Sequence, residues 1–248
     1  PSATMLVRIM EGIVVTLLFV GLWQLVHAVG GSEVLTSPAD TVKRLSVLMQ
    51  SSNFMGHVSE TLRALWLSLL ISCLGGAAIG ILLGANRRLG EIIEPLIVTF
   101  QAVPKVTLYP VILLLFGLGF AAKVAFGAMH GLVPMTLITL NAIRSLNPSL
   151  KRTARTFRLS AAQAFGTVFI PATVPEIVTA MRLSFSVTFL GVMVGEMFAS
   201  KRGLGFMIMN GISINDVATM MAVTLLIGVF AIVANGVLVA IDNRLHWR

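Results

Sequence analysis

The four histidines are the first residues to test for catalysis or metal binding, and they are scattered singly through the 248-residue chain, at His27, His57, His130 and His246. None stands four residues from another, the spacing with which two helical histidines hold a metal. Ser184 and Ser186 have no histidine or aspartate close by in the sequence, and no nucleophile elbow surrounds them. The sequence therefore predicts neither a catalytic centre nor a metal site.

Two glycine-rich segments, 117–119 and 203–205, are the next candidates, because glycine-rich loops can cradle phosphates. Both lack the Lys-Ser or Lys-Thr pair that follows in a phosphate-binding loop. We expect that the chain binds no cofactor, is not itself an enzyme and cannot hydrolyse ATP.

Ionisable and polar residues inside apolar segments are a stronger signal, because a charge near the centre of a bilayer costs about 2.5–3.5 kcal/mol even on the mildest scale. One interpretation is that they line an aqueous path, which Lys105 and Arg182 would make attractive to an anion. The other is that Arg182 and Glu196 reach toward the interfaces or form a structural ion pair. The candidate path residues are Gln101, Lys105, Tyr109, Arg182 and Glu196.

These residues sit in a chain whose composition is that of an integral membrane protein. Hydrophobic residues make up 56% of the sequence, charged residues 11%, and the mean hydropathy is +0.93. The net charge of +8 falls mostly in loops, so membrane topology accounts for it and no nucleic-acid partner is expected. The single cysteine, Cys73, excludes an internal disulfide.

Apolar segments of about 20 residues predict an all-α protein with about six transmembrane helices in one domain, 1–248. The first segment follows Arg8 as a signal peptide would, but the later spans favour a retained helix. Between the first two spans we expect a short helix through Met49 with Asp40 as its N-cap. The expected spans are 9–29, 62–85, 95–117, 121–143, 173–199 and 217–241.

Glycines and prolines predict how the spans pack. Glycines at 76, 80 and 84, and again at 191 and 195, recur every four residues, a spacing that lets another helix approach closely. We expect this packing within one subunit in preference to a seam between two copies. Pro95, Pro104 and Pro110 predict that the third span is broken, which membranes tolerate where protein or water satisfies the freed backbone groups.

The polar segment 144–171 interrupts the apolar runs with several cations. The positive-inside rule places it, with both termini, in the cytoplasm. We predict a helix over 150–164 with Ala154, Phe157, Ala161 and Ala164 on one face. That face suits an interfacial helix, or a knob that docks into a groove of a cytoplasmic partner. The residues expected to contact such a partner are Ala154, Arg155, Phe157, Arg158, Leu159, Ser160 and Ala161.

The same segment carries a resemblance to a known family. The stretch Arg152–Ser160 and the closing Phe169-Ile170-Pro171 resemble the cytoplasmic motif of type I ABC importer permeases. Further matches are to the nitrate, sulfonate, taurine and bicarbonate branch, and they cover nearly the whole chain: Glu94-Pro95, Val103-Pro104-Lys105, Pro110, Phe116-Gly117-Leu118-Gly119, Pro171–Glu176, Met181-Arg182-Leu183, Gly195-Glu196-Met197 and Gly203-Leu204-Gly205.

The resemblance implies a type I permease fold with a cytoplasmic coupling helix, in a bacterial inner membrane. It implies a homodimer of this permease or a pair with a similar subunit, two ATPase subunits that use ATP and Mg, and an extracytoplasmic substrate-binding protein. The branch suggests a small anion or organic sulfonate as the solute, although related permeases serve uncharged thiamine precursors.

Two residues depart from the family pattern: Arg152 stands where Glu is usual, and Arg158 where Gly is usual. The first reverses the charge that a partner would meet, and the second replaces a flexible residue with a long cation.

The alternative function is a secondary transporter or channel without an ATPase. Inverted repeats and midplane carboxylates would support it, and neither is clear in the sequence.

Overall fold

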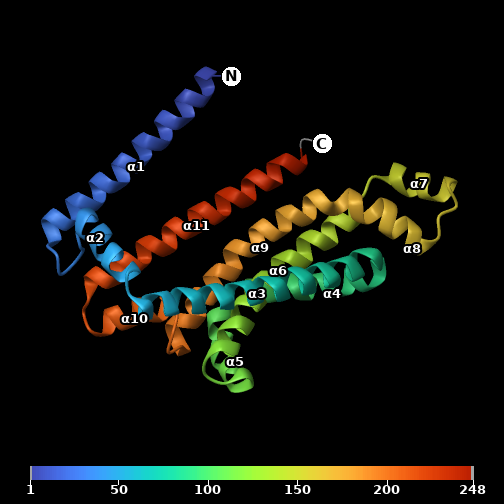
Figure 1. Ribbon diagram of the computed structural model, residues 1–248. Coiled ribbons are helices and arrows are strands. Elements are labelled where there is room, and N and C mark those ends of the chain that lie inside the picture. Colours follow the sequence, from blue (N-terminus) through green and yellow to red (C-terminus); the bar gives the residue numbers. More distant parts are fainter. Residues whose placement is uncertain (1, 247–248) are drawn as a thin grey trace.

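The computed structural model describes residues 2–246, with side chains for all of these except 2–6, 8, 9, 151, 155, 161, 162, 199, 245 and 246. This part of the chain is helical and contains no strand (Figure 1). Its elements are α1 (Ser2–Gly30), α2 (Pro38–Met49), α3 (Ser52–Ala85), α4 (Arg87–Ala102), η1 (Lys105–Leu108), α5 (Tyr109–Phe116), α6 (Phe120–Arg144), α7 (Pro148–Thr156), α8 (Ala161–Ala164), η2 (Phe165–Phe169), α9 (Ile170–Ala199), α10 (Leu204–Ser213) and α11 (Val217–His246).

Five helical segments of the described chain are long and apolar enough to cross a membrane, and a bent helix pair makes up to six. The bent pair is α4 with η1 and α5, which meet at 93° around Pro104, as the prolines of the third span predict. Several helices begin earlier than expected, and the largest differences are at α3, which begins at Ser52, and α4, which begins at Arg87. The first turns of α3 look like a loop in the sequence because their polar side chains find partners only in the folded bundle.

Glycines set the spacing of the central helices. A Cβ atom built on Gly76 or Gly80 would lie 2.6 Å from the Cβ of Met135 or Thr139 on α6. On Gly84 it would lie 2.7 Å from the Cβ of Ile143. All three contacts are shorter than real Cβ contacts, so α3 approaches α6 this closely only because these positions lack side chains. The expectation that this glycine row packs within the subunit is confirmed.

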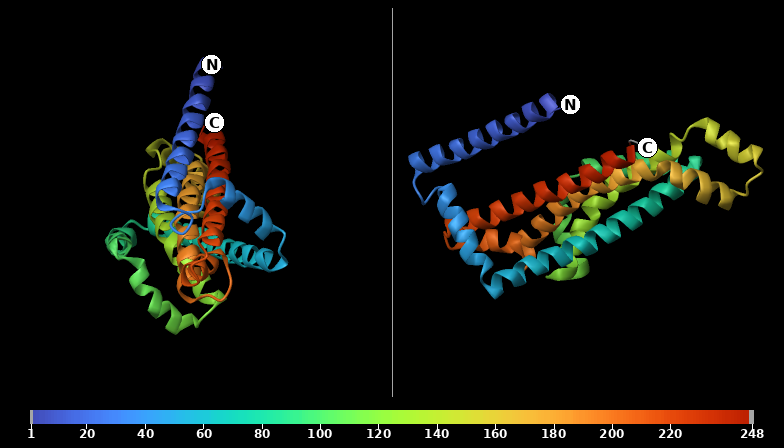
Figure 2. Two further views of the ribbon diagram at one scale, coloured as in Figure 1. Left: turned by 90° about the vertical axis from the view of Figure 1, so that its left-hand side faces the viewer. Right: turned by 45° about the horizontal axis from the view of Figure 1, so that its top comes forward.

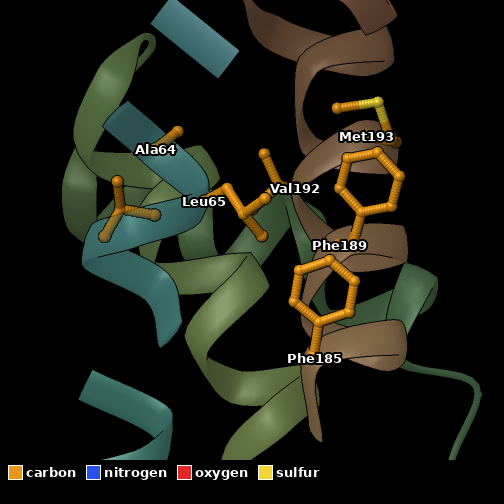
Figure 3. Packing of buried hydrophobic residues seen from close by; sticks show 7 residues of the cluster. Ala64, Leu65, Phe185, Phe189, Val192 and Met193 are labelled. Atoms are coloured by element: carbon orange, nitrogen blue, oxygen red, sulfur yellow. The ribbon is translucent and has the colours of Figure 1, made fainter. Parts of the chain in front are cut away.

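On its other side α6 packs against α9, where the second glycine pair lies. A Cβ atom on Gly191 would meet the Cα of Gly127 at 3.0 Å, and one on Gly195 would meet the Cα of Lys123 at 3.1 Å. The core then fills with side chains of α3, α6 and α9, four of which come from α9 alone (Figure 3): Ala64, Leu65, Val124, Phe185, Phe189, Val192 and Met193. Three helices are thereby held as one body, with α11 against α9.

The outer elements are attached more lightly. Figures 1 and 2 show α1 outside the group formed by α3, α6, α9 and α11, and its membrane segment Met10–Gly30 is 0% buried. Trp23 Nε1 donates to the Thr36 carbonyl at 2.9 Å, which holds the end of α1 near α2. Such an apolar, unburied helix is suited to lipid on all sides.

The N-cap of α2 is Ser37, so the expectation of Asp40 in that role is wrong. The Ser37 hydroxyl accepts the Asp40 N–H at 3.1 Å, and Pro38 occupies the first helical position, where its missing N–H costs nothing. Asp40 lies in the first turn instead. The Ser37 hydroxyl also donates to its carboxylate at 2.7 Å, which holds the pKa of Asp40 below its usual value.

Candidate functional site

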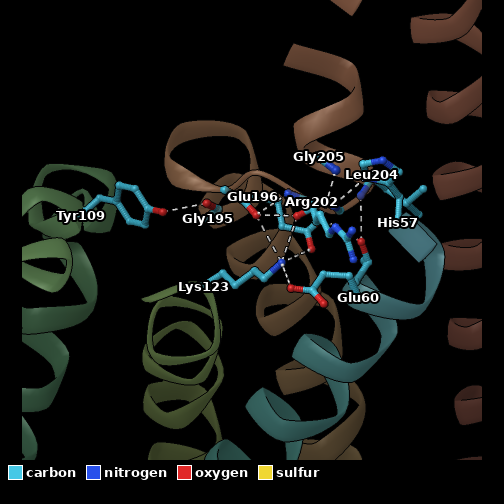
Figure 4. A network of polar contacts seen from close by, with 12 residues as sticks. His57, Glu60, Tyr109, Lys123, Gly195, Glu196, Arg202, Leu204 and Gly205 are labelled. Carbon is cyan, nitrogen blue, oxygen red and sulfur yellow. Dashed lines mark hydrogen bonds and ion pairs between the residues drawn. The ribbon is translucent and has the colours of Figure 1, made fainter. Parts of the chain in front are cut away.

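A group of charges, two of them buried and one half-buried, lies at the end of the bundle that carries α10 (Figure 4). Lys123, near the start of α6, is 1% exposed, and its Nζ lies 3.1 Å from Glu60 Oε1 on α3 and 3.2 Å from Glu196 Oε1 on α9. The Glu196 side chain is 0% exposed. We call Glu60, Lys123 and Glu196 the charge cluster. Buried charges are tolerated only when paired and hydrogen-bonded, and here one cation serves two carboxylates.

The remaining hydrogen-bonding capacity of the charge cluster is used by the surrounding chain. Glu196 Oε2 accepts the Thr61 hydroxyl at 2.8 Å and the Gly205 N–H at 3.1 Å. Lys123 Nζ donates to the Ser200 hydroxyl at 3.3 Å and to the Arg202 carbonyl at 3.0 Å. The charge cluster therefore ties α3, α6 and α9 to the turn that precedes α10.

That turn requires its glycines. Gly203 has φ 127°, a conformation that L side chains rarely adopt, and a Cβ atom there would overlap the Glu196 carboxylate. The Gly203 N–H donates to His57 Nδ1 at 3.0 Å, and the next N–H, of Leu204, donates to the Thr61 hydroxyl at 2.8 Å. The segment 203–205, which ends the turn and begins α10, thus packs closely around the Glu196 carboxylate.

Two members of the charge cluster are absent from the residues that the sequence singles out. Lys123 stands at the edge of the expected span 121–143, where hydropathy alone does not single it out, and the structure buries it. Glu60 lies in the segment that is expected to be a loop. Glu196, a candidate path residue, is placed in an ion pair, the alternative that the sequence leaves open, with Lys123 as the partner.

Tyr109 lies beside the same end of the bundle. Its hydroxyl donates to the Gly195 carbonyl at 2.7 Å, and its buried ring packs edge-on against Phe126, with centroids 4.8 Å apart. Tyr109 therefore anchors the start of α5 to α9, one residue before Glu196.

The other candidate path residues are not gathered around Glu196. Lys105 Nζ donates to the Gln101 carbonyl at 3.4 Å, and both residues lie at the bend between α4 and α5. Arg182 stands 14 residues before Glu196 on the continuous helix α9, about 21 Å along its axis. Its Nε lies 3.5 Å from Asp242 Oδ2, an ion pair between α9 and α11. The five candidates thus occupy three separate places.

At the opposite end of the bundle the segment 144–171 forms two short helices, so the expected single helix over 150–164 is wrong. Helix α7 ends at Thr156, and Arg158 adopts φ 49°. The Leu159 N–H then reaches back to the Ala154 carbonyl at 3.1 Å, the closing bond of a Schellman motif. Arg158 therefore occupies a left-handed position that normally favours glycine.

A second helix start follows within three residues. The Ser160 hydroxyl accepts the Gln163 N–H at 3.3 Å, and Gln163 Oε1 accepts the Ser160 N–H at 3.0 Å. This reciprocal pair is a capping box, for which Ser-x-x-Gln is the sequence signal. From there α8 runs through the π-helical η2 into α9 without a break.

The turn between α7 and α8 separates residues that the expected single helix would have placed on one face. Ala154 and Ala164 are 5% and 7% exposed, whereas Phe157 is 72% exposed. Arg158 and Ser160 are exposed and Leu159 is half-buried. The side chains of Arg155 and Ala161 lie outside the described part. What the turn offers to a partner is therefore Phe157, with Arg158 beside it in the sequence.

Comparison with known proteins decides the family. The model of the family described as "binding-protein-dependent transport system inner membrane component" matches residues 76–247, which include the last third of α3 and all elements from α4 to α11. The chain belongs to this family. Both the charge cluster residues of α6 and α9 and the turn at Arg158 fall inside the matched region.

Individual relatives agree with that assignment. The chain is 29% identical over 203 residues to the putative aliphatic sulfonates transport permease SsuC of Bacillus subtilis, covering 81% of this chain and 74% of SsuC. It is 28% identical over 191 residues to the formylaminopyrimidine transport permease ThiX of Halalkalibacterium halodurans, covering 77% and 76%. It is 26% identical over 181 residues to the taurine transport permease TauC of Escherichia coli, covering 71% and 66%.

A solved structure shows the same fold. A chain of the MetNI methionine ABC transporter, in an inward-facing conformation, superposes with a TM-score of 0.68 at 18% identity, covering 76% of this chain and 94% of that one. The protein is thus a multi-pass inner-membrane permease with the ABC importer fold, and the alternative of a transporter or channel working alone is not favoured.

Proposed function

We propose that this permease moves a small anion or organic sulfonate inward across a bacterial inner membrane, driven by ATP hydrolysis in separate subunits. The observation that carries the proposal is the family match over residues 76–247, which includes the turn between α7 and α8. The names of SsuC and TauC, which refer to sulfonates and taurine, support the solute class. ATP and Mg are bound by the partner ATPase, and this chain binds no cofactor.

The bend between α4 and α5 supports a pair of permease copies that share one path. Lys105 lies in the bent pair that is apolar enough to enter a membrane, and the ion pairs of the described residues do not include it. A cation in that position is costly against lipid, so the face that carries Lys105 and Gln101 requires water or a second protein surface. A second copy facing this bend would enclose an aqueous path with cations on its wall, which favours anions.

The segment 144–171 is the proposed contact through which movement of the ATPase is passed to the membrane helices. The ATPase would grip Phe157 and the adjacent turn, and α8, η2 and α9 would carry its movement into the membrane as one continuous helical path. The companion helices are tied at the same end, where Arg144 of α6 forms an ion pair with Glu94 of α4. Movement of the turn would thus reach α9 first and α4 through α6.

In this arrangement both termini and the α7–α8 turn face the cytoplasm, and the charge cluster and α10 face outward toward the substrate-binding protein. The excess of Lys and Arg at the α7 end supports this orientation. Fusion of green fluorescent protein to the C-terminus should give fluorescent cells, and a non-fluorescent fusion of full length would reverse the orientation.

Transport by the purified parts tests the proposal. The permease should co-purify with ATPase subunits encoded beside it, and proteoliposomes containing both with the binding protein should accumulate radiolabelled taurine only when ATP and Mg are present on the ATPase side. Accumulation without ATP would contradict ATP-driven import. Accumulation of a formylaminopyrimidine in place of any sulfonate would correct the solute class and leave the mechanism intact.

A further inference from the structure

A small polar pocket lies next to the charge cluster. Its volume is about 280 Å³, and its lining combines a hydroxyl, an amide, an imidazole and a guanidinium: Ser52, Asn53, Gly56, His57 and Arg202. Three other cavities each include a carboxylate, from Glu60, Glu91 or Glu176. A pocket lined by hydrogen-bond donors and no carboxylate is suited to an anion.

His57 is fixed as a donor toward this pocket. Its side chain is 9% exposed, its ring stacks on Phe206 with centroids 5.9 Å apart, and its Nδ1 accepts the Gly203 N–H at 3.0 Å. An imidazole whose Nδ1 accepts a hydrogen bond carries its proton on Nε2. Within the described part of the chain Nε2 has no hydrogen-bond partner, so the neutral ring offers a donor to the pocket that it lines.

Arg202 adds a full positive charge on a fixed piece of backbone. Its carbonyl accepts Lys123 Nζ at 3.0 Å and its N–H donates to the Ser200 hydroxyl at 3.2 Å, so the charge cluster holds the main chain. Arg202 lines the pocket, and none of the ion pairs among the described residues uses its guanidinium. A guanidinium presents paired donors that match the oxygens of a sulfonate or carboxylate.

The start of α3 completes the wall. Ser52 and Asn53 are its first two residues, and the N-cap Ser51 makes no side-chain bond to the free N–H groups of the first turn. Those groups and the helix dipole favour negative charge at this position. They act together with His57 and Arg202, which come from elsewhere in the fold.

We propose that this pocket binds a small oxyanion bearing a sulfonate or sulfate group, as an entry site at the outer end of the permease. The inference rests on the proposed function for its orientation and for the solute class. Because Gly203 bonds to His57 and the Arg202 carbonyl bonds to Lys123, an anion in the pocket contacts the same turn that the charge cluster holds. Occupancy of the pocket would therefore stabilise the closed turn before α10.

Binding of methanesulfonate to the permease–ATPase complex tests this, with dimethyl sulfone as an uncharged ligand of similar shape. The complex is placed in nanodiscs of phosphatidylcholine, which carry no net charge, without binding protein or ATP, and binding is followed by titration calorimetry. We expect methanesulfonate to bind and dimethyl sulfone not to bind. Arg202→Gln should weaken methanesulfonate binding at least about tenfold, since it removes the charged donor.

The matched control is Lys201→Gln, which removes the same charge one residue away from a side chain that does not line the pocket. It should leave methanesulfonate binding unchanged.

Equal weakening of methanesulfonate binding by both variants, or no binding to the wild-type complex, would overturn the proposal. The proposal would also fail if Arg202→Gln left methanesulfonate binding unchanged and weakened only the association with the binding protein. The pocket would then receive an acidic side chain of that protein and not a free anion. None of these measurements uses ATP turnover or transport, so the pocket can fail while ATP-driven import stands.

Discussion

The two ends of the helical bundle differ in how they treat polar and charged groups. At the α10 end, Lys123 and Glu196 are enclosed and bonded to each other, to Thr61 and to the backbone of the following turn. At the α7 end, the turn after α7 leaves Phe157 72% exposed and carries exposed Arg158. Figure 1 shows these regions at opposite extremes of α9.

The difference indicates that the charge cluster is complete within one chain. Its charges are satisfied internally, which is a costly arrangement that is stable only while every partner is present. The α7 end exposes an aromatic ring and cations, the kinds of residue that dominate protein interfaces. A single helix joins the two, so a partner that moves the α7 end acts on a helix whose far end is anchored.

Of the substitutions that test this difference between the two ends, removal of Lys123 should have the largest effect on stability. Lys123→Met leaves Glu196 buried without its cation, and we expect the permease to lose about 3–5 kcal/mol of stability, because one partner of a buried pair is removed. Thermal unfolding in a mild detergent measures the loss. Lys43→Met is the control, since Lys43 pairs with Asp40 in an exposed ion pair that contributes little.

If Lys123→Met fails to fold, the double variant with Glu196→Gln keeps the test informative. It removes the uncompensated charge and should recover part of the lost stability. A single variant that unfolds at the wild-type temperature would show that the charge cluster does not hold this end together.

Substitution of Gly205 should have the next largest effect. A Cβ atom on Gly205 would lie 2.5 Å from the Met193 carbonyl oxygen and 2.8 Å from the Glu196 Cβ, so Gly205→Ala must displace the start of α10 from α9. We expect a loss of about 1–3 kcal/mol from overpacking. Gly236→Ala on α11 is the matched control, because nothing lies within 4 Å of its added Cβ. An equal result for the two variants would contradict the close fit of this turn.

Much of the fold follows from the sequence, because long apolar runs and four-residue glycine spacing report burial directly. The six expected spans correspond to the five long helices and the bent pair, and the Gly76, Gly80 and Gly84 row packs where the spacing indicates. The prolines predict that the third span is broken, although the 93° angle depends on what the two halves pack against.

The charge cluster is not predictable in the same way. Lys123 and Glu196 are 73 residues apart, and hydropathy cannot distinguish a lysine at the mouth of a span from one that turns inward to a carboxylate. The turn after α7 is predictable from the sequence only in part. The Ser160 and Gln163 capping box is readable in the sequence, whereas the left-handed conformation of Arg158 contradicts the ordinary preference of its residue type.

At the α7 end, truncation of Phe157 should weaken the ATPase contact and leave the fold intact. Because the ring is largely exposed, Phe157→Ala removes little packing within the chain, whereas an aromatic anchor in a partner's groove is worth a tenfold or larger change in affinity, about 1.4 kcal/mol or more. Retention of the ATPase on a tagged permease, followed by ATPase stimulation, measures the effect.

Phe116→Ala is the control, since Phe116 is also an exposed aromatic residue but ends α5, away from the turn. It should retain the ATPase as the wild type does. Wild-type retention and stimulation in Phe157→Ala would mean that this ring is not part of the docking surface.

The smallest effect is expected at Arg158, where backbone and charge can be separated. At φ 49° an arginine bears a steric cost of about 1–2 kcal/mol that glycine does not, so Arg158→Gly relieves local strain. Glycine also gains freedom in the unfolded chain, which offsets part of this gain, and we expect a net change in stability below about 1 kcal/mol.

The informative measurement at Arg158 is therefore binding of the ATPase. If the guanidinium meets an acidic rim on the ATPase, Arg158→Gly should weaken association severalfold, whereas Arg158→Lys, which keeps the charge and the backbone cost, should retain most of it. Equal association of all three proteins would mean that this position contributes only its left-handed turn, as the usual glycine would.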